Sequence, residues 1–147
     1  MHDYALSDDR PFDRISRHQK DLRQRKFIAD TFNPKIFVSL HVNWSANKKR
    51  REPVVIYQVS DESFQLAQIV QNHLNDYYGM SKAPQKGTAY FLMKNLDMPS
   101  IIVELGYLSN AEDFQLLVQE HSQDQLVAAM VQAIEEYFLA FPFDNEA

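Results

Sequence analysis

The chain has 147 residues, of which 45% are hydrophobic and 24% are charged, with a formal net charge of −5 and no cysteine. This length and composition predict one globular domain with a single core, and no apolar run approaches the roughly 18 residues that a membrane span requires. The negative charge disfavours nucleic acid as a partner, and the lack of cysteine excludes disulfides, thiolate zinc sites and a cysteine nucleophile.

The first predicted elements are a helix and a strand. Ser16 and Gln19 have the spacing of a capping box and predict the start of the helix, which Asn33-Pro34 ends. The apolar stripe of this helix consists of Leu22, Ile28, Ala29 and Phe32. Residues 36–43 follow at once and predict a buried strand, because apolar residues occupy every second position.

A basic run, Lys48-Lys49-Arg50-Arg51, follows this strand. It belongs to a basic half of the chain, since residues 1–52 contain 12 of the 15 lysines and arginines. Such a run is usually a solvated loop, and the alternative is a binding patch for an anionic polymer. The sequence leaves both readings open.

The pattern in the middle of the chain predicts three further strands around a long helix. Residues 54–57 form a short β-branched run, and Ser60 is placed to cap a helix that Gly79 terminates. The predicted buried face of this helix consists of Ala67, Val70, Leu74 and Tyr77. Strands are then expected over residues 89–93 and, after Pro99, over residues 100–106.

Two helices complete the pattern. Asn110 is placed to cap a short helix that runs to about Glu120, and a final helix begins at Ser122. Its core-facing residues are Leu126, Met130, Ala133, Ile134, Tyr137 and Phe138. Strands that alternate with helices predict an α/β fold, a three-layer sandwich with a mixed or mostly parallel sheet between helices. We expect one domain over residues 1–141 and a loose tail over residues 142–147.

Polar residues occur at the carboxyl ends of two predicted strands. Ser39, His41 and Asn43 share one face of the first strand, and Glu104 interrupts the apolar strand 100–106. A buried ionised carboxylate needs a hydrogen-bonded partner, a metal-bound water or a cleft, and clefts in open α/β sheets lie at the carboxyl ends of strands. His41 is thus a candidate metal ligand and Glu104 a candidate catalytic group, although spacing alone also allows ordinary core residues.

Three segments carry a family resemblance: DLRQR at 21–25, VSLHVN at 38–43 and PSIIVELGYLSN at 99–110. With them the chain resembles the catalytic domain of zinc-dependent N-acetylmuramoyl-L-alanine amidases, most closely the sporulation and germination type. The resemblance implies hydrolysis of the amide bond between N-acetylmuramic acid and L-alanine in peptidoglycan. It also implies that the protein acts outside the cytoplasm, at the cell wall or spore cortex, although the first residues do not form an export signal.

The resemblance assigns roles to four residues. His41 matches a zinc ligand, and Glu104 matches the glutamate that serves as general base and acid toward a zinc-activated water. Asn43 and Asn110 would be substrate-binding residues, although Asn43 could instead fix a turn and Asn110 could simply cap a helix.

The front of the domain departs from the family. The family's first strand, its glycine-rich segment with the first zinc histidine and a ligand glutamate are not found in this chain, so we expect a domain that is incomplete at its N-terminus. Family members hold one zinc, but a catalytic zinc needs about three protein ligands and two are missing here. Asp8 and Asp9 are possible substitutes. The alternative function is a catalytically inactive fragment, or a peptidoglycan-binding or regulatory module that has lost the metal.

Overall fold

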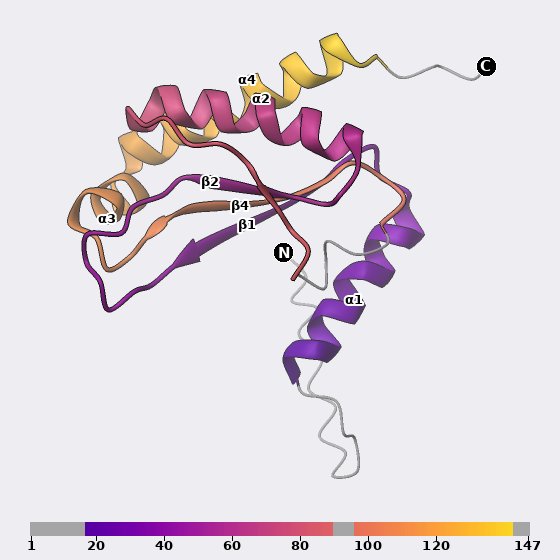
Figure 1. Cartoon of the computed structure of the whole chain (residues 1–147), viewed down its shortest axis with the longest axis horizontal. Coiled ribbons are helices and arrows are strands. Elements are labelled where there is room, and N and C mark those ends of the chain that lie inside the picture. Colours follow the sequence, from indigo (N-terminus) through magenta and orange to yellow (C-terminus); the bar gives the residue numbers. More distant parts are fainter. Residues whose placement is uncertain (1–16, 90–95, 143–147) are drawn as a thin grey trace.

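Within the described residues, 17–89 and 96–142, four strands form one sheet in the order β1-β4-β2-β3. The computed structural model in Figure 1 places them at β1 (Phe37–Asn43), β2 (Val54–Tyr57), β3 (Gln85–Lys86) and β4 (Ser100–Tyr107). β4 runs parallel to β1 and antiparallel to β2, and β3 runs parallel to β2. The sheet is therefore mixed, one of the two arrangements that the sequence predicts.

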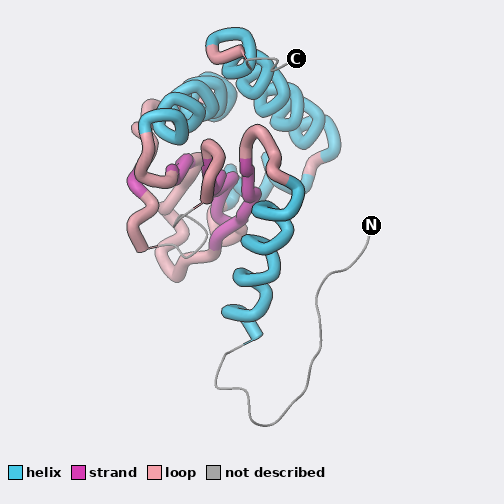
Figure 2. Tube along the Cα trace, turned by 90° about the vertical axis from the view of Figure 1, so that its right-hand side faces the viewer, coloured by secondary structure: helices cyan, strands magenta, loops and turns pink. Residues whose placement is uncertain are grey.

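The same part of the chain contains four helices: α1 (Arg17–Phe32), α2 (Asp61–Tyr78), α3 (Ala111–Val118) and α4 (Glu120–Ala140). α2 and α4 lie over one face of the sheet, and α1 lies on the other side (Figures 1 and 2). Helices on both faces of a mixed sheet confirm the predicted α/β sandwich. None of the described helices combines the length and apolarity needed to cross a membrane.

The main hydrophobic core lies between the sheet and the helices α2 and α4. It includes Val55 of β2, Ile101 and Val103 of β4, Leu74 of α2 and Ala133 of α4, all fully buried. On the opposite face Val54, Ile56 and Ile102 form a smaller cluster that Leu22 of α1 contacts. Alternation along the strands thus gives β2 and β4 two buried faces.

The predicted helix ends at Ser60, Gly79 and Asn110 are confirmed, whereas the last helix begins at Glu120 and not at Ser122. The side chain of Ser60 accepts a hydrogen bond from the backbone N–H of Ser63, and Gly79 ends α2 with a left-handed φ of 63°. The side chain of Asn110 accepts hydrogen bonds from the backbone N–H groups of Glu112 and Asp113 at the start of α3. These caps satisfy backbone groups that a helix end leaves unpaired.

Several sequence predictions are wrong in detail. β1 is only partly buried, since Leu40 and Val42 are 59% and 50% exposed, and Phe32 at the end of α1 is exposed. The reason is that β1 is an edge of the described sheet, while α2 and α4 pack over β2 and β4. Tyr78 rather than Tyr77 is the buried tyrosine of α2. Most of the strand predicted at residues 89–93 lies outside the described residues.

Candidate active site

The two strand-end residues singled out in the sequence are neighbours in the sheet. His41 of β1 pairs in register with Glu104 of β4, and Val54 of β2 pairs with Glu104 on the opposite side. Glu104 therefore lies on an inner strand, between His41 and Val54 of the two neighbouring strands. This pairing places both polar residues on the same face of the sheet, as strand alternation predicts.

The imidazole of His41 is partly buried and has a defined neighbour. The hydroxyl of Ser39, two residues earlier on the same face of β1, lies 2.9 Å from its Nε2 atom. Burial lowers the pKa of His41, and the positive charge of Arg25 lowers it further. The ring is therefore neutral at neutral pH, which is the form that offers a lone pair to a metal or a proton.

The carboxyl group of Glu104 is buried, and one of its oxygens has no hydrogen bond to replace the lost contact with water. Only 7% of the residue is exposed, and its Oε2 atom is buried with no hydrogen-bond partner. Burial raises the pKa of Glu104 above its ordinary value because the charged form loses solvation. A raised pKa makes the carboxylate a stronger proton acceptor, and the carboxyl group that results can return the proton.

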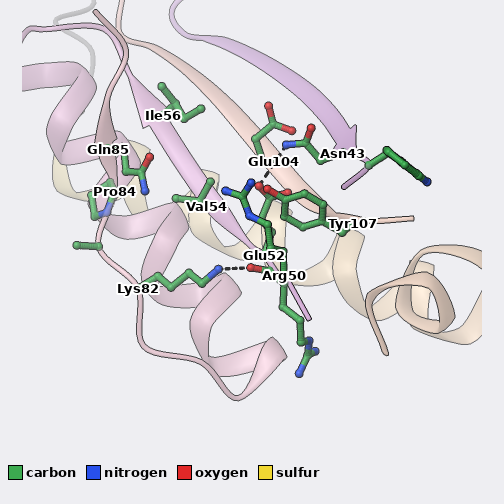
Figure 3. A pocket seen from close by; sticks show the side chains of 13 residues that line it. Asn43, Arg50, Glu52, Val54, Ile56, Lys82, Pro84, Gln85, Glu104 and Tyr107 are labelled. Carbon is green, nitrogen blue, oxygen red and sulfur yellow. Dashed lines mark hydrogen bonds between the residues drawn. The ribbon is translucent and has the colours of Figure 1, made fainter. Parts of the chain in front are cut away.

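Glu104 forms part of the wall of a cavity of about 770 Å³ (Figure 3). The cavity lies between the end of β1, the segment before β2 and the segment between α2 and β3. Its lining residues are Asn43, Trp44, Arg50, Arg51, Glu52, Val54, Ile56, Lys82, Ala83, Pro84, Gln85, Glu104 and Tyr107. His41 is not among them, so of the two strand-end residues Glu104 is the one that faces the cavity.

A second buried carboxylate, Glu52, lines the same cavity and is absent from the sequence prediction. It is 5% exposed, its Oε1 atom accepts a hydrogen bond of 3.3 Å from Asn43, and its Oε2 atom has no partner. Burial raises the pKa of Glu52, and the nearby negative charge of Glu104 acts in the same direction. Its position two residues before the buried run 54–57 is a signal, but the pairing of β2 with β4 and the bonds to Asp113 are what bring it beside Glu104.

The two asparagines have different surroundings. Asn43 lines the cavity and donates a hydrogen bond to Glu52, while its predicted contact with substrate stays a prediction. Asn110 caps α3, and its Nδ2 atom donates to the carbonyl oxygen of Lys48 at 2.7 Å. The structural role considered for Asn110 is therefore present, while a contact of Asn110 with substrate stays a prediction.

The basic run after β1 is exposed at Lys48, Lys49 and Arg50, while its last residue, Arg51, is anchored. Arg51 forms ion pairs with Glu112 and with Asp113, which is fully buried. The other carboxylate oxygen of Asp113 accepts the backbone N–H groups of Glu52 and Tyr107, each at 3.0 Å. One buried carboxylate thus ties the segment before β2 to the end of β4. These bonds hold Glu52 next to Glu104.

The described residues do not by themselves form a zinc site. Within residues 17–89 and 96–142, no group of three histidine, cysteine, aspartate or glutamate side chains is arranged to hold a metal ion. His41 would supply one of the roughly three ligands that a catalytic zinc needs. The possible substitutes Asp8 and Asp9 lie outside the described residues.

Comparisons with known proteins identify one family. A family model described as N-acetylmuramoyl-L-alanine amidase matches residues 6–136. The germination-specific N-acetylmuramoyl-L-alanine amidase of Bacillus subtilis is 25% identical over 124 residues, which are 83% of this chain and 52% of that protein. The chain thus spans about half the length of that relative.

Solved structures agree on the fold. The CwlD amidase of Clostridioides difficile, solved in complex with the GerS lipoprotein, matches this structure with a TM-score of 0.82 at 24% sequence identity. The match covers 92% of this chain and 70% of the CwlD chain. The N-acetylmuramoyl-L-alanine amidase AmiC2 of Nostoc punctiforme matches with a TM-score of 0.70 at 28% sequence identity, over 80% of this chain and 65% of the AmiC2 chain.

Proposed function

The chain belongs to the N-acetylmuramoyl-L-alanine amidase family, and we propose that it hydrolyses the amide bond between N-acetylmuramic acid and L-alanine in peptidoglycan. The observation that supports this proposal most directly is the placement of Glu104. A buried carboxyl group with an unpartnered oxygen forms part of the wall of a cavity of about 770 Å³. Buried unpaired carboxyl groups are costly, and in enzymes such groups often carry the chemistry.

Glu104 is the proposed carrier of the proton. Its carboxylate takes a proton from the attacking water, whose oxygen bonds to the carbonyl carbon of the scissile amide. The carbon–nitrogen bond then breaks, and the same carboxyl group returns the proton to the departing amine. The products are the carboxylate of N-acetylmuramic acid and the free amino group of L-alanine. The raised pKa of Glu104 suits both transfers.

Zinc is a separate prediction, because the described residues do not complete a ligand set. His41 is the described residue proposed to hold the ion. The metal content of the purified chain, measured by mass spectrometry before and after a His41→Ala substitution, tests this role. One zinc per chain that the substitution removes would support it, and an equal metal content in both chains would contradict it.

A second candidate function is a peptidoglycan-binding module without catalysis. The lack of a metal-binding group among the described residues favours this alternative. Both candidates place the protein at the cell wall or spore cortex, outside the cytoplasm, with peptidoglycan as the partner.

The products of digestion distinguish the two candidates. Purified peptidoglycan is incubated with the chain, and new amino termini and new reducing sugar ends are labelled and identified by mass spectrometry. The amidase proposal predicts new L-alanine amino termini without new reducing ends. Sedimentation of the chain with peptidoglycan, without release of L-alanine termini, would instead identify the binding module.

A further inference from the structure

Trp44 is the only tryptophan in the sequence, and 71% of it is exposed. Tryptophan is on average a highly buried residue, because its ring presents a large apolar surface. Trp44 directly follows Asn43, the last residue of β1, and lines the cavity that contains Glu104. An exposed indole thus lies at the wall of the proposed catalytic cavity.

The cavity differs chemically from side to side. In Figure 3, Asn43 and Lys82 lie on opposite sides of Glu52 and Glu104. Lys82 lines the cavity on the side of the segment between α2 and β3, and its Nζ atom donates to the carbonyl oxygen of Arg51. Arg50 and Arg51 also line the cavity, and Arg50 lies 5.4 Å from the ring centroid of Tyr107, the register partner of Asn43. The side of Lys82 therefore offers an ammonium group, while the side next to Asn43 offers the exposed ring of Trp44 beside a guanidinium group.

The proposed substrate likewise consists of an uncharged sugar and a peptide that carries negative charge. In the muramic acid residue the carboxyl group is consumed in the amide bond, so the sugar is uncharged and presents C–H groups on its ring faces. The stem peptide carries free carboxylates, including that of its C-terminus. An aromatic face favours apolar C–H surface, and an ammonium group favours carboxylates.

From this match we propose that the ring of Trp44 stacks on a sugar ring of the glycan, so that the stem peptide extends toward Lys82. This inference rests on the proposed function, since it assigns the two halves of the amidase substrate to the two sides of the cavity. The scissile bond then lies between them, beside Glu104. Trp44 is a specificity-determining residue in this arrangement, and it transfers no proton.

The single tryptophan makes the contact directly measurable. Fluorescence of the Glu104→Gln variant, which keeps Trp44 but is expected to turn over substrate at least about 10²-fold more slowly, is titrated with a muropeptide, with the peptide-free disaccharide and with the free stem peptide. A stacked sugar shields the indole from water, so the muropeptide and disaccharide should shift the emission to shorter wavelength in a saturable way. The free peptide should leave the emission unchanged.

Kinetics of the active chain give a second readout. Trp44→Ala should raise KM for the muropeptide about tenfold while kcat changes little, and Trp44→Phe should recover part of the loss because it restores an aromatic face. Leu139→Ala is the matched control, since Leu139 is 83% exposed on α4 and is not among the cavity residues. Its KM should equal that of the parent chain.

The outcomes separate this inference from the proposed function. If the parent chain cleaves the muropeptide but neither the emission of Trp44 nor KM of Trp44→Ala responds, the stacking contact is wrong and the amidase function stands. An emission change caused by the free peptide alone would also overturn the assignment of the two sides. If the chain neither binds nor cleaves the muropeptide, the proposed function fails and this inference fails with it.

Discussion

His41 of β1 lies directly opposite Glu104 of β4 in the parallel register of the two strands. In a parallel pair the side chains at such positions leave the sheet on the same face. The two residues therefore lie on neighbouring strands at one end of the sheet, although 62 residues separate them in the sequence. Asp113 and Asn43 then bring a second carboxylate, Glu52, to the same place.

The first prediction concerns Glu52 and pH. Because burial and the charge of Glu104 raise the pKa of Glu52 above 4.5, the folded chain keeps this proton to a higher pH than the unfolded chain does. The stabilisation is complete below pH 4.5 and is lost as pH rises through the folded pKa. The free energy of unfolding of the parent should therefore fall, relative to Glu52→Gln, as pH rises above 4.5 through the folded pKa.

Urea unfolding of both chains at several pH values measures this difference. The pKa of His41 is lowered, so His41 changes the free energy of unfolding in the opposite direction: its contribution to stability is lost as pH falls below 6.5. That contribution is present in both chains and cancels in the comparison. A difference that is constant with pH would contradict the raised pKa of Glu52.

The second prediction compares two adjacent carboxylates that share one arginine. Asp113 is fully buried and accepts bonds from Arg51, Glu52 and Tyr107, whereas the side chain of Glu112 is 71% exposed. Asp113→Asn replaces an accepting oxygen with a donor and should lower the free energy of unfolding by about 3 kcal/mol. Glu112→Gln should lower it by less than about 1 kcal/mol, because exposed ion pairs contribute little. Equal losses in chemical denaturation would show that Asp113 does not anchor the segment before β2.

The third prediction concerns the space around Gly106, two residues after Glu104. A Cβ atom at this position would lie 3.1 Å from Cβ of Asp113 and 3.2 Å from Cδ1 of Leu117. Gly106→Ala should therefore push β4 and α3 apart and cost about 1–3 kcal/mol of stability. Gly79→Asn is the control, because Gly79 has open space around it and asparagine tolerates its left-handed conformation. A thermal melt in which Gly106→Ala matches the parent would contradict this close approach.

Local signals in the sequence predict much of the fold. Ser60, Gly79 and Asn110 act through hydrogen bonds or backbone conformations within a few residues, so the helix ends follow from the sequence. Alternation likewise predicts that Ser39, His41 and Asn43 share a face. The exposure of Leu40 does not follow from alternation, because it depends on which elements cover the edge strand β1.

The site follows from the sequence only in part. His41 and Glu104 are predicted because a histidine and a glutamate in apolar strands are conspicuous, and their motifs resemble those of a known family. Glu52 is not predicted as a site residue, because it follows a basic run and precedes Pro53, a pattern typical of a loop. Its place beside Glu104 depends on the antiparallel pairing of β2 with β4 and on the bonds to Asp113, which join residues about 60 positions apart.

The central claim is that Glu104 transfers the proton during cleavage of the amide bond between N-acetylmuramic acid and L-alanine. The most direct measurement is the rate at which L-alanine amino termini appear from a defined muropeptide, in the parent chain and in Glu104→Gln. The account predicts release by the parent and a loss of about 10²–10⁴-fold in the variant, with muropeptide binding retained. Equal rates in the two chains, or no release by a folded parent that binds the muropeptide, would contradict it.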